Sequence, residues 1–444
     1  MLLRFTVSNF LSFSDEVEFN MFPANFKIHK SHVYHTEGGV DLLKAAAIYG
    51  ANGSGKSNFI EAIDFFRDII TFEETISMVH PHFKLDEKYT ELPTKLEVEI
   101  SVDNRFLIYG ISLKDDHIFE EWLRESFVSK NEVEVIFNRK FEKGKPIIRL
   151  HDKYLESEKT KMRFEIYVED LKNDGLFLNR VSNHIIEANI VLNWFTSSLL
   201  TIKPSTTYSL TKRLHEERGF EEHVNHILKH INLGMAKIGI KQVDIKDFFG
   251  ENEEDEIQKN RIQRELKKKT SHMFHSEEGE IYVAVKKGRK IYIETLTTYN
   301  KGKNKELVEL NLSEQSDGTQ RILDLIPIIS LLEQEATTIF VDEIDRSLHP
   351  TMAIEFLRFL MSRKTKGQLI FTTHESHLLD LDIFRQDEIW FTEKNEEGST
   401  KMYPLSDYKP RYDLDIQKGY LAGRFGAIPF LGNLADLVPA YEIQ

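Results

Sequence analysis

The sequence predicts an α/β fold in which a mixed sheet is joined to an antiparallel lobe and interrupted by a helical insertion. Three observations lead to this class. A glycine-rich loop at 50–57 lies between an apolar and an amphipathic run, residues 94–140 alternate apolar and polar, and residues 150–270 carry apolar residues at helical spacing. Such a loop requires a strand before it and a helix after it, whereas strict alternation is typical of half-buried strands.

Composition and charge limit the classes of protein to which the chain can belong. Its 444 residues allow two or three domains, and 41% hydrophobic with 29% charged residues is typical of a soluble globular protein. The absence of cysteine excludes disulfides, cysteine-ligated zinc and thiol catalysis, and it suits a cytoplasmic location. No apolar run is long enough for a membrane span. The net charge of −14 excludes a generally basic surface and leaves only a local basic patch for nucleic acid.

The first 44 residues are expected to form two short strands and a loop. Residues 1–20 alternate like strands joined at Ser8-Asn9, and they lack the apolar core of a signal peptide. The segment 21–44 is loop-like and carries three histidines, His29, His32 and His35. These suggest a metal, but without neighbouring carboxylates a solvated segment is the favoured interpretation.

The loop around which the chain is organised has the spacing Gly-x-x-x-x-Gly-Lys-Ser, which is that of a P-loop. Its glycines let several backbone amides converge on one anion, and the helix that begins near Lys56 adds its positive end. We expect Lys56 to reach the β- and γ-phosphates of a nucleotide and Ser57 to ligate Mg²⁺. The expected nucleotide-binding residues are Asn52, Gly53, Ser54, Gly55, Lys56, Ser57 and Asn58.

The middle of the chain changes character twice. Residues 94–140 predict an antiparallel meander, residues 150–270 predict helices, and strands return near 280. The expected domains are the two halves of one head, 1–145 and 280–444, and a mostly helical insertion at 146–279. Inside the insertion an acidic run, 251–256, is followed by a basic run, 261–269. A solvated helix is the favoured interpretation of these runs, and a contact with nucleic acid or a partner protein is the alternative.

A second cluster of chemical residues follows two apolar runs in the C-terminal half. The run 337–341 ends in Asp342 and Glu343, the Walker B pattern. We expect Asp342 to hold Mg²⁺ and Glu343 to act as the general base on the attacking water. The run 367–373 ends in His374. A lone histidine is usually structural, but this position after a core strand favours a residue that senses the γ-phosphate.

A third element lies between these two motifs. Ser316, Gly318 and Thr319 precede a run of apolar residues at helical spacing, so they are expected at the N-terminus of a helix, where anions bind. Because one P-loop already serves the nucleotide of its own chain, this second anion-binding end is best explained as acting across a dimer.

These motifs, in this order, resemble those of the ABC-type ATPase heads of the SMC, RecF and OLD group. The resemblance is strongest to stand-alone prokaryotic AAA/ABC-like ATPases, many of which serve in phage defence of the abortive-infection type. It extends from one end of the chain to the other outside the insertion, through the opening Phe5-x-Val7-x-Asn9-Phe10-x-Ser12-Phe13, the segment from Asp342 to Pro350, and the tail from Tyr420 to Pro429. The resemblance implies two ATP molecules, with Mg²⁺, held between the two heads of a homodimer, and it allows higher oligomers.

The chain departs from the ABC pattern at three places. Asp317 stands where the signature has a small residue, and His349 stands where ABC ATPases carry the D-loop aspartate. No glutamine precedes Gln242, so Glu120 or Glu121 is a weak candidate for the Q-loop role. The residues after His374 are too few for the nuclease domain of OLD proteins, so we interpret the Asp380/Asp382 and Asp413/Asp415 pairs as turn residues.

The favoured function is an ATPase switch in a prokaryotic anti-phage defence or DNA-transaction system, controlling a separate effector such as a nuclease or toxin encoded nearby. A RecF-like repair ATPase that binds DNA directly is the alternative, and a transporter ATPase is disfavoured by the insertion and the lack of a membrane segment. Two surfaces are candidates for partner docking, the run from Glu251 to Lys269 and the apolar tail from Tyr420 to Leu431. For the tail, closure of the protein's own core is the favoured interpretation.

Overall fold

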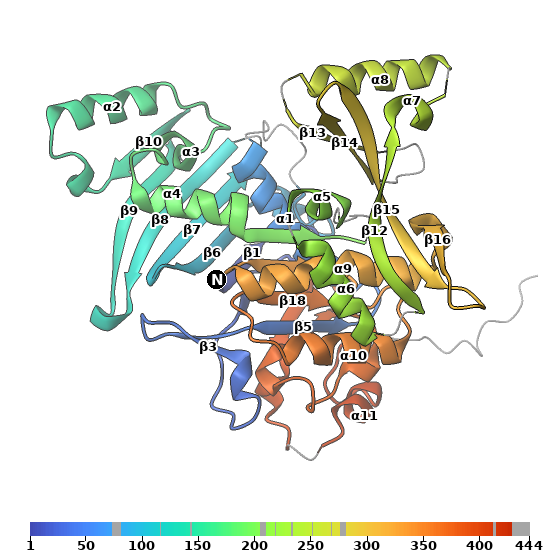
Figure 1. Ribbon diagram of the computed structural model, residues 1–444. Coiled ribbons are helices and arrows are strands. Elements are labelled where there is room, and N and C mark those ends of the chain that lie inside the picture. The colour runs from blue at the N-terminus through green and yellow to red at the C-terminus, as the bar shows by residue number, and fades with distance from the viewer. Residues whose placement is uncertain are drawn as a thin grey trace, which may run out of the picture. The chain divides into compact units, whose positions relative to one another are not determined.

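The structure is a computed structural model that divides into two compact units (Figure 1). Unit 1 comprises Met1–Pro204, Leu332–Asp345 and Met361–Gln444, and unit 2 comprises Ser205–Leu331 and Arg346–Leu360. The chain therefore passes from one unit to the other at Pro204, Leu331, Asp345 and Leu360. The described residues are 1–72, 81–115, 117–142, 144–204, 210–217, 219–231, 234–250, 252–267, 269–275, 281–411 and 414–428.

The central sheet of unit 1 has the strand order β11-β17-β18-β5-β19-β20. Its first five strands are parallel and β20 is antiparallel to β19. The bounds are β11 Leu199–Ile202, β17 Thr338–Val341, β18 Gln368–Thr372, β5 Ala45–Gly50, β19 Ile389–Lys394 and β20 Thr400–Pro404. Every residue of β5, β17 and β18 is buried, as expected for parallel strands covered on both faces. The predicted mixed sheet is confirmed.

A seven-stranded antiparallel sheet forms the second layer of unit 1, in the order β10-β9-β8-β7-β6-β1-β2. Its strands are β1 Leu2–Ser8, β2 Val17–Asn20, β6 Thr94–Val102, β7 Arg105–Lys114, β8 His117–Phe127, β9 Glu132–Glu142 and β10 Lys145–Leu150. The meander predicted for 94–140 is therefore confirmed. The first two strands also exist, but residues 9–16 join them, because Phe10 and Phe13 turn back into the core as a bridged pair.

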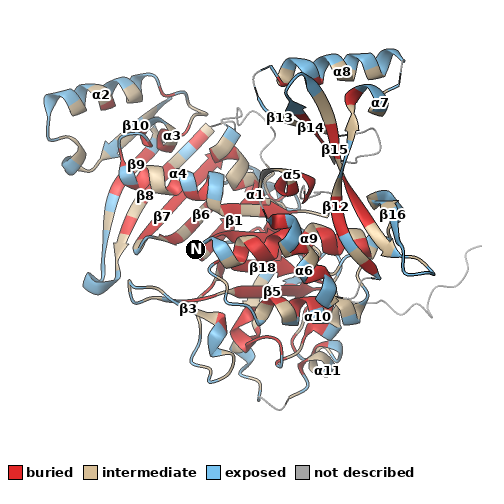
Figure 2. Cartoon of the chain, in the orientation of Figure 1, coloured by how far each residue is buried: buried red, intermediate tan, exposed pale blue. Residues whose placement is uncertain are grey.

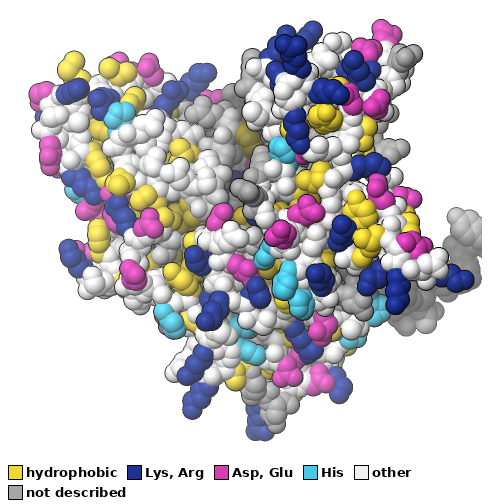
Figure 3. Space-filling view, in the orientation of Figure 1, with side chains coloured by type: hydrophobic (Ala, Val, Ile, Leu, Met, Phe, Trp, Pro, Cys, Tyr) yellow, Lys and Arg dark blue, Asp and Glu magenta, His cyan; other side chains and the backbone are white. Residues whose placement is uncertain are grey.

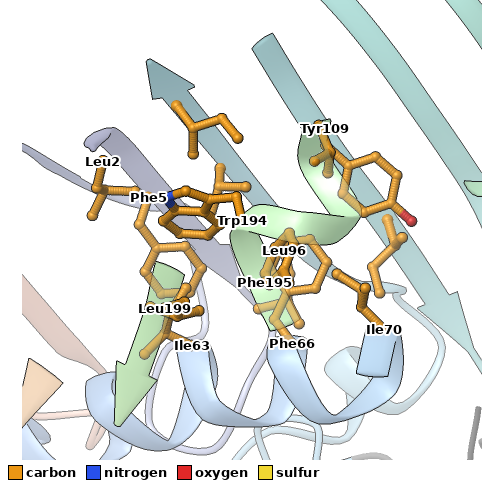
Figure 4. Packing of buried hydrophobic residues seen from close by; sticks show 14 of the residues in the cluster. Leu2, Phe5, Ile63, Phe66, Ile70, Leu96, Tyr109, Trp194, Phe195 and Leu199 are labelled. Carbon is orange, nitrogen blue, oxygen red and sulfur yellow. The ribbon is translucent and has the colours of Figure 1, made fainter. Parts of the chain in front are cut away.

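Helix α1 (Lys56–Phe72) packs between the P-loop strand and the antiparallel sheet. Figure 4 shows its apolar side chains Ile63, Phe66 and Ile70 turned toward residues of the sheet and of α4 (Ile186–Asn193) with its following turn. Those partners include Phe5, Leu96, Tyr109, Trp194, Phe195 and Leu199. Figure 2 shows the same buried band running through both layers of unit 1. The core thus holds the helix that begins at the P-loop.

The segment 146–279 differs from the predicted helical insertion. It contains α2 Glu158–Glu169, α3 Phe177–Val181, α4, α5 Leu210–Glu216, α6 Phe220–Ile231, α7 Ile245–Phe248 and α8 Glu253–Glu265, but also most of β10 and all of β11, β12 and β13. The boundary between the units falls at Pro204, not at 145 or 279. The physical reason is burial: α3 and α4 contribute to the core of the antiparallel sheet, and β11 pairs with β17.

Unit 2 is built on a five-stranded antiparallel sheet, β12-β15-β14-β13 with β16 paired to β15. Its strands are β12 Met235–Asp244, β13 Ser271–His275, β14 Ile281–Lys287, β15 Lys290–Lys301 and β16 Leu307–Asn311. A small core of Ile245, Ile262, Leu266, Ala284 and Ile293 joins α7 and α8 to the sheet. Helices α9 (Asp317–Gln334) and α10 (Pro350–Met361) complete the unit. Within the acidic-then-basic stretch, residues 253–265 form α8, whereas Lys267 and Lys269 follow the helix; Glu251 and Lys268 lie outside the described residues.

The histidine loop differs from the solvated segment that was expected. His32 is buried, and its Nδ1 lies 3.0 Å from Glu388 Oε2; His35 pairs with Asp41. The loop is tied down by β3 (Val33–His35), β4 (Asp41–Leu43) and the hydrogen bond between His32 and Glu388. Within the described ranges no group of three or more His, Asp or Glu side chains could hold a metal, and no helix is long and apolar enough to cross a membrane.

Candidate nucleotide site

Three neighbouring parallel strands bring the sequence motifs of unit 1 to one edge of the central sheet. The P-loop follows β5, His374 follows β18, and Asp342 and Glu343 follow β17. The three strands are adjacent in the order β17-β18-β5. Because parallel strands end at the same edge, four side chains from distant parts of the chain converge there.

Lys56 is buried at the start of α1, with its ammonium folded back into the P-loop. Its Nζ donates to the carbonyl oxygens of Gly50 (2.8 Å) and Ala51 (3.0 Å). Burial lowers the pKa of Lys56 to about 8. The nearby carboxylates of Asp342, Glu343 and Asp345 raise this pKa, but their effect is smaller. The ammonium of Lys56 therefore donates to neutral acceptors. A bound anion would favour the charged form of Lys56.

His374 connects this lysine to the Walker B acid. Its Nδ1 lies 3.3 Å from Lys56 Nζ, and its Nε2 lies 3.9 Å from Glu343 Oε1. An ammonium has no lone pair, so Nδ1 accepts and the ring proton sits on Nε2, facing Glu343. Burial and the charge of Lys56 lower the pKa of His374, which favours the neutral imidazole, and its Nε2 faces Glu343 from beyond hydrogen-bond distance.

Thr372, the last residue of β18, sets the positions of both acids. Its hydroxyl donates to Asp342 Oδ1 (2.5 Å) and accepts from the backbone amide of Glu343 (2.8 Å). Asp342 is buried and Glu343 is half-buried, with a backbone φ of +49°. A positive φ is unfavourable for a residue with a Cβ, and the bond from Thr372 helps to hold it. No sequence pattern indicates the role of Thr372.

A collar of hydroxyl groups supports the P-loop from outside. Thr400 Oγ1 donates to the carbonyl of Ser54 (2.9 Å) and lies 2.8 Å from Ser12 Oγ, and Asn58 Nδ2 donates to the same Ser12 oxygen (2.8 Å). The hydroxyl of Ser54 is bonded to Thr392 (2.7 Å). The side chains of Ser54 and Asn58 therefore serve the loop, whereas Asn52, Gly53 and Ser57 are exposed. Ser12 belongs to the N-terminal motif, but the sequence alone does not predict its contacts with Thr400 and Asn58.

Gly55 shows how tightly this collar closes. Its φ is +108°, and a Cβ at this position would lie 2.2 Å from Thr400 Oγ1 and 2.9 Å from Ser12 Oγ. Only glycine fits both the backbone conformation and the space. Gly53 also has a positive φ, of +75°, but a Cβ there would meet nothing within 4 Å. The loop is thus closed on the side of Gly55 and open at Gly53.

The third motif belongs to unit 2, whereas the residues above belong to unit 1. The hydroxyl of Ser316 accepts from the backbone amide of Thr319 (3.3 Å) and lies 3.0 Å from its hydroxyl, at the start of α9. A Cβ on Gly318 would lie 2.8 Å from the carbonyl oxygen of Ser347, which precedes α10. The close approach of these two backbones requires glycine. Ser316 caps α9 locally, and Gly318 packs it against the segment that follows Walker B.

Three other expectations concern residues outside the group described above. Glu121 is fully buried and accepts from the amides of Phe177 and Leu178 (2.8 Å each), so its carboxylate holds α3 and the weak Q-loop assignment fails for it. Asp380 and Asp415 accept from amides two and three residues later, as turn and cap residues do; Asp413 lies outside the described residues. In the tail, Tyr420 and Phe425 stack on Phe391 and close the core, whereas Pro429 to Leu431 lie outside the described part.

A nucleotide and Mg²⁺ fit the residues that converge here. The ammonium of Lys56 contacts two carbonyls and an imidazole, none of which carries negative charge. Oxygen ligands of the kind that Mg²⁺ prefers are supplied by the exposed hydroxyl of Ser57 and the buried carboxylate of Asp342. The site therefore offers a cation for phosphate and oxygens for a divalent metal.

Comparisons with known proteins give a family and several structural matches. The family model described as "AAA domain, putative AbiEii toxin, Type IV TA system" matches residues 45–149 and 204–380. A search of the curated proteins finds no match. Among solved structures, the chain is similar to the SMC head domain from Thermotoga maritima, at 14% identity and a TM-score of 0.37, covering 91% of this chain and 98% of that one.

Two further structures contain an Smc head together with part of ScpA. The first, an SmcHead bound to the C-winged helix domain of ScpA, matches at 14% identity and a TM-score of 0.41, over 92% of this chain and 99% of that chain. The second, an Smc head domain with an extended coiled coil bound to the C-terminal domain of ScpA, is derived from Pyrococcus furiosus. It matches at 15% identity and a TM-score of 0.36, over 95% and 99% of the two chains.

Proposed function

Because the chain belongs to the AAA-domain family of the AbiEii toxin type, we propose that it is a Mg²⁺-dependent ATPase whose ATP-gated self-association switches a separate effector. One observation carries the ATPase proposal. Lys56, Asp342, Glu343 and His374 meet at one edge of three adjacent parallel strands, with 3.3 Å and 3.9 Å separating His374 from its two charged neighbours. Phosphoryl transfer needs this combination of cation, metal ligand and base.

Each residue of the chain has a distinct task in the proposed reaction. Mg²⁺, when bound, neutralises charge on the phosphates. Lys56 supplies positive charge to the β- and γ-phosphates, while Ser57 and Asp342 hold the metal. Glu343 accepts the proton of the attacking water, and the Nε2–H of His374 orients the Glu343 carboxylate and senses the γ-phosphate. Thr372 keeps the two acids in register through its pair of hydrogen bonds.

Self-association is proposed because the third motif has no evident task at the nucleotide of its own chain, which the P-loop already serves. Ser316, Gly318 and Thr319 lie at the start of α9 in unit 2, where the positive end of the helix dipole favours an anion. In the proposed homodimer this end contacts the nucleotide held by the P-loop of the other chain. Asp317 lies in the same turn, so we expect weak affinity of this end for phosphate until Mg²⁺ offsets the charge.

The biological setting is proposed from the family. Its description names a toxin of a type IV toxin–antitoxin system, which supports a role in defence of a prokaryotic cell. An effector encoded nearby would then respond to the ATP-bound dimer. A cytoplasmic location follows from the same proposal.

The first prediction separates binding from hydrolysis. Lys56→Ala removes the buried cation, so we expect ATP binding or turnover to be abolished. Glu343→Gln keeps the phosphate contacts but cannot accept a proton, so this variant should retain ATP and accumulate as a dimer. Calorimetry with ATP and Mg²⁺, a phosphate-release assay and mass photometry measure the three quantities.

Glu375→Gln is the matched control, because Glu375 follows His374 but its carboxylate is engaged by His377. It should hydrolyse ATP at the wild-type rate. Wild-type hydrolysis by Glu343→Gln would remove Glu343 from its role. An ATP-loaded Glu343→Gln protein that stays monomeric would contradict the dimer while leaving the ATPase proposal intact.

A further inference from the structure

The β-hairpin of β14 and β15 in unit 2 carries a dense group of positive charges. Lys287 pairs across the hairpin with Lys290, and only Gly288 and Arg289 join the strands. Gly288 has the positive φ, of +64°, that such a tight turn needs. All residues from 286 to 290 are exposed. The tip therefore presents four cations, Lys286, Lys287, Arg289 and Lys290, within five residues.

The end of α8 brings further cations to the same place. The chain leaves α8 at Glu265 and enters β13 at Ser271, which pairs with Val285 of β14. The amide of Lys286 donates to the carbonyl of Thr270 (3.1 Å), so the exposed side chains of Lys267 and Lys269 approach the hairpin. We call Lys267, Lys269, Lys286, Lys287, Arg289 and Lys290 the basic tip. Figure 3 shows Lys and Arg side chains gathered over this end of α8.

The charge of the basic tip is largely uncompensated. Lys287 Nζ lies 3.4 Å from Glu294 Oε1, and in the part of the chain that the structure describes no other cation of the tip has an ion pair. The segments 267–275 and 286–290 contain no Asp or Glu. The nearest acid of α8 is Glu265, two residues before Lys267, whereas the acidic first turn of α8 is about 20 Å away along the helix, beyond a Debye length at physiological salt. The basic tip thus stays positive in a chain of net charge −14.

The chemistry of the tip favours the phosphate backbone of a nucleic-acid duplex over a protein. A protein interface needs an apolar, water-excluding centre, but the exposed run Lys-Lys-Gly-Arg-Lys has no apolar side chain. A row of unpaired cations instead matches a regular row of phosphates, whose neutralisation releases counterions. A two-stranded β-ribbon also has the width that the major groove of a DNA duplex admits.

We propose that the basic tip is a sequence-independent docking site for a nucleic-acid duplex. The hairpin contacts phosphates through Lys286, Arg289 and Lys290, and Lys267 and Lys269 extend the contact from the end of α8. Lys287 is bound in part to Glu294, so it contributes less. This site does not depend on ATP hydrolysis, because none of its residues belongs to the nucleotide site.

Fluorescence anisotropy on the full chain, without nucleotide, tests the proposal. The probes are a labelled 30-bp DNA duplex and an RNA duplex of the same sequence, titrated from 50 to 300 mM salt. The test variant is Lys286→Gln/Arg289→Gln/Lys290→Gln, which spares Lys287 and its buried partner. With three phosphate contacts removed, the slope of log affinity against log salt should flatten by about 2 to 3, and affinity at 100 mM salt should fall at least tenfold.

The matched control is Lys301→Gln/Lys303→Gln/Lys305→Gln. It removes the same three charges from exposed positions at the other end of β15, next to Glu306. The control should bind with wild-type affinity and slope, and both triple variants should keep the wild-type thermal transition. Stronger binding of one duplex assigns the biological source, DNA or RNA, and equal binding supports recognition of the backbone alone.

Four results would overturn the proposal. The wild-type chain could bind neither duplex, or the test variant could bind with an unchanged slope. The control could also lose as much affinity as the test variant, in which case net charge and not the basic tip governs binding. Poly-glutamate of matched charge serves as a competitor. Equal affinity for it would show a general polyanion surface in place of a duplex site. These measurements are made without nucleotide, so they stay valid even if the ATPase proposal is wrong. The duplex proposal and the ATPase proposal can therefore fail separately.

Discussion

Lys56 combines burial and charge in a way that makes nucleotide affinity depend on pH. Burial lowers its pKa from 10.5 to about 8 in the free protein, and bound phosphates would raise it again. Above pH 8 the free protein loses this proton, and ATP binding must take it up. We expect affinity for ATP to fall as pH rises from 8, by up to about tenfold per pH unit. Calorimetry in two buffers of different ionisation enthalpy measures the proton uptake.

Lys56→Arg provides the control for this effect, because a guanidinium does not deprotonate in this range. Any residual ATP binding of that variant should be flat between pH 7 and 9.5. A flat profile for the wild-type protein over the same range would contradict the role of Lys56 as the titrating group.

The residues of the candidate site divide into those that sequence patterns reveal and those that only the fold reveals. The P-loop, the Walker B acids and His374 each end or follow an apolar run, so a local pattern indicated them, and the structure brings them together. Thr372 and Thr400 have no such pattern. Each acts on a group 30 or more positions away, namely Asp342 and Ser54. A hydrogen bond across neighbouring strands can be inferred only when the strand order is known.

At the scale of elements, Glu121 holds α3 to the antiparallel sheet. Its two oxygens accept from the amides of Phe177 and Leu178, and Arg139, which is also fully buried, lies 3.4 Å from one of them. Glu121→Ala would leave a buried guanidinium without its carboxylate and α3 without its cap. We expect a loss of about 3–5 kcal/mol in the free energy of unfolding, measured by urea denaturation.

Glu120→Ala is the matched control, since Glu120 pairs with Lys140 at the surface, at 2.7 Å. Exposed pairs of this kind contribute less than about 1 kcal/mol. Similar losses for the two variants would show that the buried carboxylate does not organise this region.

Helices and strands were predictable where the hydrophobic pattern repeats over enough residues to be recognised. The strands β6 to β9 have 9 to 11 residues each, and their alternation was clear. Strand β11 has four residues, Leu199–Ile202, too few to show a period after the helical pattern of α4. Strand β11 pairs with β17, whose residues lie 139 positions later in the chain. Because this pairing cannot be seen locally, the sequence predicts a helical insertion here.

At the scale of the whole molecule, the division into two units predicts which changes spare catalysis. Neutralising Arg264, Lys267, Lys268 and Lys269 together alters unit 2, whereas the groups that converge after β5, β17 and β18 belong to unit 1; Lys268 lies outside the described residues. We expect steady-state ATPase activity to stay within about threefold, under 1 kcal/mol, while binding of nucleic acid or a partner weakens. Abolished hydrolysis with normal binding would instead assign this segment to the catalytic machinery.

The strand order of the central sheet also has a consequence for how the protein is made. The P-loop strand β5, whose six residues are all buried, lies between β18 and β19, and β18 begins at Gln368. A ribosome adds roughly 5–20 residues per second, so β5 waits on the order of 15–60 s for its neighbours. During that interval an apolar strand with unpaired edges is exposed on the nascent chain. A chaperone that shields Ala45–Gly50 during translation would therefore raise the yield of nucleotide-binding protein.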